Sequence, residues 1–116
     1  MGKAGGISIH AVDVSTGRVA AGLAVELHRL DPVPALVASG TIGPNGLLDH
    51  PSAAGEGITA GLYEVRFDLG AFFAAAGREA PFLDQVPFRF HVRQVAEHYH
   101  LPFKFTPFGF SLFRGA

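Results

Sequence analysis

The chain has 116 residues, a formal net charge of −1 and no cysteine. This length fits a single domain over residues 1–116, large enough to bury a core without disulfides or metal. The lack of cysteine excludes disulfide frameworks, zinc–thiolate sites and thiol nucleophiles. Near-neutral charge argues against a nucleic-acid or anionic-membrane partner. No apolar run approaches the roughly 20 residues that span a bilayer, and the first residues lack the apolar stretch of a signal peptide, so we expect a cytoplasmic protein.

Short segments of alternating hydrophobicity predict strands in the first half of the chain. At residues 7–11, Ile7 and Ile9 alternate with Ser8 and His10, so the two pairs face opposite ways. Further strands are predicted at residues 23–28 and 35–41, with turns at 13–17 and 43–46 and a loop at 51–61. Within the second turn, an Asn-Gly pair is a strong turn signal.

The second half continues the pattern and contains the one predicted helix. A strand at 62–68 is followed by an alanine-rich helix at 69–76, which ends before Gly77 in the position of a helix cap. Strands are then predicted at 86–95, 99–105 and 108–113. About seven strands, with turns every ten or so residues, predict an antiparallel β-sandwich.

Three histidines and one arginine are the candidates for chemistry. His10, His98 and His100 fall on the polar faces of their strands, and an imidazole can exchange protons near neutral pH. They are also consistent with solvated surface side chains or, on a weak spacing signal, with a three-histidine zinc site. Near the chain end, Arg114 has paired donors suited to an anion or a planar amide oxygen, but it also fits a charged chain terminus.

Two motifs at opposite ends of the chain resemble those of the transthyretin-like proteins, whose enzymatic members are 5-hydroxyisourate hydrolases. Residues 9–13 and 16–22 are similar to the opening of that family, and residues 97–102, 106–111 and 113–115 to its C-terminal signature. The resemblance covers nearly the whole chain. It implies a transthyretin-like antiparallel β-sandwich of seven or eight strands with one short helix. It also implies a homotetramer, built as a dimer of dimers, with active sites in the channel between dimers.

The resemblance further implies a reaction and its residues. The family opens the ring of 5-hydroxyisourate by hydrolysis during urate breakdown, with neither a metal nor an organic cofactor. Its catalytic positions correspond to His10, His100 and Arg114, and we expect His98 to contribute to substrate binding. In such a site one histidine activates a water molecule, while cationic donors stabilise the oxyanion formed at the attacked carbonyl.

Three positions depart from the family pattern, each towards apolar character. The family's mid-chain catalytic arginine corresponds to Leu47, and its terminal tyrosine and serine correspond to Phe113 and Ala116. We expect these three positions to line the substrate site. Loss of a single oxyanion donor costs about 100- to 1000-fold in turnover. His50 and Arg18 are candidates to replace the missing charge.

Three functions are therefore consistent with the sequence. The first is a 5-hydroxyisourate hydrolase or a close relative acting on another cyclic ureide or lactam, favoured by the two histidines and Arg114. The second is a non-catalytic binding protein for a small apolar molecule, favoured by the three apolar replacements. The third is a related enzyme with a more apolar substrate. All three predict a small-molecule ligand, with no nucleic acid and no membrane as partner.

Overall fold

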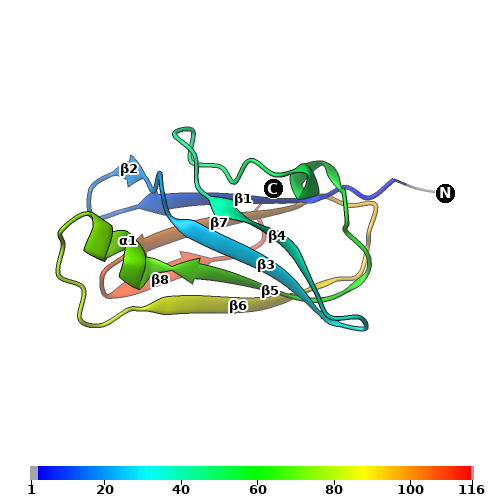
Figure 1. Ribbon diagram of the computed structural model, residues 1–116. Helices are drawn as coiled ribbons and strands as arrows, with labels where there is room; N and C mark the ends of the chain where they lie inside the picture. Colours follow the sequence, from blue (N-terminus) through cyan, green and yellow to red (C-terminus); the bar gives the residue numbers. More distant parts are fainter. Residues whose placement is uncertain (1–2, 116) are drawn as a thin grey trace.

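A computed structural model describes residues 3–115, which form two four-stranded sheets packed face to face (Figure 1). The first sheet has the order β2-β1-β7-β8 and the second the order β4-β3-β5-β6. The strands are β1 (Ile7–Asp13), β2 (Arg18–Val19), β3 (Ala24–Asp31), β4 (Ala35–Thr41), β5 (Gly61–Asp68), β6 (Gln85–Val92), β7 (Tyr99–Thr106) and β8 (Gly109–Leu112). One short α-helix, α1 (Leu69–Ala75), and a 3-10 helix, η1 (Pro51–Ala54), complete the elements of this part of the chain.

The predicted sandwich is confirmed, with one exception to its antiparallel pairing. Strands β1 and β7 run parallel, with Ile7 opposite Tyr99 and Asp13 opposite Phe105. Between these two strands the chain leaves the first sheet and builds the whole second sheet (Figure 1). Such a long connection allows a parallel pair, which a tight hairpin does not. The strand predicted to reach residue 95 ends at Val92, and the two-residue β2 was not predicted.

The alternation in β1 fixes which side chains face the core and which face outward. Ile7, Ile9 and Ala11 are buried between the sheets, whereas Ser8 and His10 lie on the outer face of the first sheet. Aromatic side chains fill the middle of the sandwich, where Phe67 and Phe103 stack with ring centroids 3.9 Å apart. The buried residues thus hold the polar residues of β1 and β7 on one outer surface.

The helix lies at one end of the sandwich and has a defined start and stop. The Asp68 carboxylate accepts a hydrogen bond from the Ala71 amide at 3.1 Å, which caps the first turn. Gly77 has φ +67°, the left-handed conformation expected of a residue that ends a helix. Among the described residues, no helix is long and apolar enough to cross a membrane.

Candidate active site

The parallel pairing of β1 with β7 brings two of the predicted catalytic histidines together. Ser8 lies opposite His100 and His10 lies opposite Pro102, all on the outer face of the first sheet. The ring centroids of His10 and His100 are 6.5 Å apart and their planes are inclined by 42°. Both side chains are half-buried. Two residues from opposite ends of the sequence therefore face one surface site.

A serine that the sequence had not singled out links two of the histidines. The Ser8 hydroxyl lies 2.6 Å from Nδ1 of His100 and 2.8 Å from Nε2 of His98. The other nitrogen of His98, Nδ1, lies 2.6 Å from the carbonyl oxygen of Gly5. The alternation of β1 had placed Ser8 on the same face as His10, but only the strand register shows that it meets the histidines of β7.

The surroundings of His100 favour its neutral form. Partial burial lowers the pKa of the His100 imidazole, and the nearby rings of His10 and His98 lower it further by charge repulsion. A neutral imidazole has one free lone pair. His100 is therefore suited to accept a proton at neutral pH.

Two glycines allow the backbone to approach the histidine rings. A Cβ atom on Gly46 would lie 2.5 Å from Nε2 of His10, and Gly46 has φ +83°. A Cβ on Gly115 would lie 3.0 Å from Cδ2 of His100, and the Gly115 amide donates a 2.7 Å hydrogen bond to the His100 carbonyl. The mid-chain turn and the C-terminal segment thus flank the site on either side, in positions that only glycine fills without displacement.

The position of the expected mid-chain arginine lies next to His10. Leu47 forms an isolated β-bridge with His10 and is half-buried. Of the two candidates for replacing the missing charge, His50 lines a surface pocket together with Leu47, and its Nδ1 accepts a 3.1 Å hydrogen bond from the Ser52 amide and caps η1. Arg18 lies opposite Asp13 in the pairing of β2 with β1, three residues along β1 from His10.

Arg114 is not brought to the His10–His100 pair, which differs from the expectation from sequence, although its guanidinium donates a 3.1 Å hydrogen bond to the backbone carbonyl of His98. Its guanidinium lies over the ring of Tyr99, 4.1 Å from the centroid, and donates to the Glu97 carboxylate at 3.2 Å. Tyr99 is buried on the inner face of β7, whereas the neighbouring His100 points to the outer face. Arg114 therefore lies on the opposite side of the first sheet from the His10–His100 pair.

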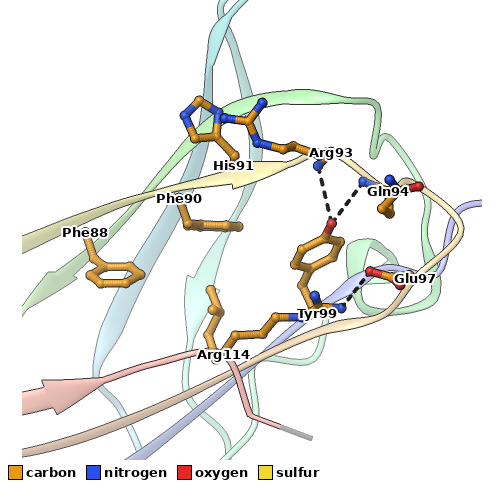
Figure 2. A pocket seen from close by; sticks show the side chains of 9 residues that line it. Phe88, Phe90, His91, Arg93, Gln94, Glu97, Tyr99 and Arg114 are labelled. Atoms are coloured by element: carbon orange, nitrogen blue, oxygen red, sulfur yellow. Dashed lines mark hydrogen bonds and ion pairs between the residues drawn. The ribbon is translucent and has the colours of Figure 1, made fainter.

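Arg114 instead lines a separate cavity of about 380 Å³ between the two sheets (Figure 2). Phe88 and Phe90 of β6 form its apolar wall, and the Tyr99 hydroxyl accepts hydrogen bonds from the backbone amides of Arg93 and Gln94. The sequence pattern could not reveal this, because the side to which a chain-terminal residue points depends on its pairing with β7.

The remaining predicted positions are distributed as follows. Phe113 lies on the outer side, where the Lys104 ammonium sits 5.9 Å from its ring centroid. His98 contacts Ser8 and Gly5 as described above, whereas Ala116 falls outside the described residues. Within residues 3–115, no group of three or more histidine, aspartate or glutamate side chains is arranged to hold a metal ion.

The two-sheet sandwich and the histidine pair on its outer face fit the transthyretin-like class implied by the sequence motifs. The model of the HIUase/Transthyretin family matches residues 7–115, and the chain belongs to that family.

Three known proteins illustrate the relationship. The chain is 36% identical over 120 residues to 5-hydroxyisourate hydrolase 2 of Rhizobium meliloti (strain 1021), covering 100% of both chains. The structure of Klebsiella pneumoniae 5-hydroxyisourate hydrolase is similar with a TM-score of 0.80 and 32% identity, covering 100% of both. A crystal structure of (S)-allantoin synthase matches with a TM-score of 0.90 and 34% identity, covering 99% of this chain and 45% of that one.

Proposed function

We propose that this chain hydrolyses 5-hydroxyisourate, the substrate named in the descriptions of its relatives. The observation that carries the proposal is the pairing of His10 with His100 on one half-buried surface, where the pKa of His100 is lowered. Such a pair supplies one group that accepts a proton and a second that binds or returns one. The prediction that no cofactor takes part belongs to this proposal.

The proposed step needs only water as co-reactant. His100 accepts a proton from a water molecule while the water oxygen forms a bond to a ring carbonyl carbon. The carbonyl oxygen then carries the negative charge. When the oxyanion re-forms the carbonyl, the ring C–N bond breaks, and the departing nitrogen takes the proton from the His100 imidazolium. His10 lies across the site, where it can donate a hydrogen bond to the developing oxyanion.

The surroundings of His10 favour a site adapted to a more apolar substrate as the second candidate function. Leu47, bridged to His10, offers neither charge nor side-chain hydrogen bonds at the position of the family arginine. Phe113 and Ala116 extend the same trend. This divergence fits either a slow hydrolase or an enzyme or binding protein for another small molecule.

We also propose that the protein works in the cytoplasm as a homotetramer, a dimer of dimers with the histidine face lining a channel. The outer face of the first sheet carries His10, His100 and the partly exposed Phe113. A channel between dimers would shield these side chains from bulk water. That would strengthen the hydrogen bonds made during the reaction.

The proposed activity is tested by generating 5-hydroxyisourate with urate oxidase and following its ultraviolet absorbance with and without the protein. We expect the decay to accelerate, and His100→Ala and His10→Ala each to lower kcat by about 100-fold or more. Ser39→Ala, at an exposed position on β4 of the second sheet, is the matched control and keeps full rate. Decay no faster than the spontaneous rate refutes the proposed function.

The same assay separates a hydrolase that lacks one donor from a site with another substrate. Restoring the family residues with Leu47→Arg and Ala116→Ser adds a cationic donor and a hydroxyl. For a weakened hydrolase we expect kcat to rise about tenfold or more. An unchanged or lower rate favours the second candidate function, which is then pursued by thermal-shift screening for a saturable ligand.

A further inference from the structure

The three hydrogen bonds around Ser8 form a chain with a defined direction. It runs from the Gly5 carbonyl to Nδ1 of His98, from Nε2 of His98 to the Ser8 hydroxyl, and from that hydroxyl to Nδ1 of His100. A backbone carbonyl can only accept, so Nδ1 of His98 carries a proton. In the neutral ring Nε2 of His98 is then an acceptor, and it takes the Ser8 hydroxyl proton. The Ser8 oxygen therefore accepts from Nδ1–H of His100.

We propose that Ser8 and His98 are positioning residues that hold His100 in the tautomer protonated at Nδ1, leaving the lone pair on Nε2 for the reacting water. This inference rests on the proposed function for its kinetic consequence, but the tautomer itself does not depend on it. A neutral histidine has two tautomers, and the hydrogen bond made by one nitrogen decides which form is present. Without these hydrogen bonds both tautomers would be populated, and a fraction of His100 would carry its proton on Nε2, where the reaction needs a base.

The fixed end of the chain is built into the backbone. A Cβ on Gly5 would lie 2.3 Å from the carbonyl oxygen of Glu97, so this segment packs directly against the residue that precedes His98. The Gly5 amide also donates a 2.8 Å hydrogen bond to the Val95 carbonyl. Main-chain contacts thus hold the Gly5 carbonyl in place. Because this carbonyl can only accept, it fixes the donor and acceptor in each of the hydrogen bonds that follow.

Protonation of His98 reverses the chain. A doubly protonated His98 donates from Nε2 to the Ser8 oxygen, the hydroxyl turns to donate to Nδ1 of His100, and the remaining proton of neutral His100 moves to Nε2. In that arrangement Nε2 of His100 has no free lone pair for the reacting water.

Few other titratable groups face His100. From β1 the titratable group is His10, from the residue just before β7 it is His98, and from β7, on the same face as His100, it is Lys104. The C-terminal segment contributes the backbone of Gly115, because Arg114 lies on the other side of the sheet.

The test measures the ring ¹⁵N chemical shifts of His100 by nuclear magnetic resonance together with the hydrolysis kinetics. In the unchanged protein at pH 7.5 or above we expect His100 protonated at Nδ1. Ser8→Ala should give mixed tautomers and uncouple the two rings. It should also lower kcat by about ten- to a hundredfold, the range found when a metal-bound histidine loses its orienting partner, with KM unchanged. Ser8→Thr keeps the hydroxyl and should retain both properties.

A second variant tests the same hydrogen bonds without a substitution in β1. His98→Asn retains a donor for the Gly5 carbonyl but removes the acceptor for Ser8, so it should reproduce the tautomer and kcat of Ser8→Ala. Wild-type nitrogen shifts in Ser8→Ala, or protonation of His100 at Nε2 in the unchanged protein, overturn the proposal. Full kcat in both variants removes the positioning role. If the unchanged protein does not hydrolyse 5-hydroxyisourate, the nitrogen shifts alone decide whether the hydrogen-bond chain operates.

Discussion

At the scale of single residues, the site depends on how closely the backbone approaches His10. Gly46 occupies a place where a side chain would collide with the ring, because a Cβ atom there would lie 2.5 Å from Nε2 of His10 and 2.8 Å from Cγ1 of Val19. The turn that carries Gly46 also bonds to β1, since the Ala11 amide donates to the Gly46 carbonyl at 3.0 Å. This bond holds the backbone of the turn against β1, so an added side chain would displace the His10 ring rather than the turn.

We therefore expect Gly46→Ala to lower kcat/KM by about a hundredfold, the cost of misplacing a catalytic group by about 1 Å. It should also cost about 1–2 kcal/mol of stability, because alanine is strained at φ +83°. Gly17→Ala is the control: Gly17 has φ +73°, and a Cβ atom added to it would have no neighbouring atom within 4 Å. It should show the same loss of stability in denaturant unfolding without loss of activity. Equal activities in the two variants would contradict the steric role of Gly46.

At the scale of elements, a buried ion pair ties the end of β1 to the segment after α1. The carboxylate of Asp13, 2% exposed, accepts hydrogen bonds from the Ser15 hydroxyl and the Arg78 guanidinium. Arg78 also lies over the Phe73 ring, 4.8 Å from its centroid. Burial alone would raise the pKa of Asp13, but the hydrogen bonds from Ser15 and Arg78 outweigh it and hold the pKa below its usual value.

Asp13→Asn should lower the free energy of unfolding at pH 7 by about 1–3 kcal/mol, because the Arg78 guanidinium loses its charged partner. A depressed carboxyl pKa stabilises the fold above the pKa of the unfolded chain, and this contribution is lost as pH falls through the folded pKa. The difference between the two proteins should therefore shrink below about pH 4. Urea unfolding across pH checks this, with Asp49→Asn at an exposed position as the control. A difference independent of pH would mean that shape, not charge, matters at this position.

The elements also show which features of the fold and the site could be predicted from the sequence. Alternation located the long strands and the faces of Ile9 and His10, because a side-chain period of two depends on local spacing alone. The family motifs identified the histidines but placed Arg114 with them. Its position over Tyr99 follows from the register of the last residues against β7. Ser8 was missed for the same reason, since its contact with His98 and His100 arises from pairing between opposite ends of the chain.

At the scale of the whole molecule, one open side of the sandwich carries aromatic side chains that are exposed or line a cavity. In residues 3–115, β6 and β8 each have a hydrogen-bonded neighbour on one side only. Phe110 of β8 is 47% exposed there, and Phe88 and Phe90 of β6 line the cavity between the sheets (Figure 2). An exposed strand edge with apolar side chains is a template for pairing with another chain. This side is where the proposed homotetramer would join its subunits within a dimer.

Sedimentation equilibrium at micromolar concentration should therefore give a mass about four times the 12.2 kDa of the chain. Phe110→Glu places a charge on the β8 edge, and we expect it to lower this mass and kcat together, because the proposed channel forms only between assembled dimers. Phe82→Ser is the matched control: Phe82 is 69% exposed beside Phe108, in the connection between α1 and β6, and its loss should leave the mass unchanged. A single-chain mass for the unchanged protein would refute the tetramer. A full-mass Phe110→Glu variant would place the contact between subunits away from the β8 edge.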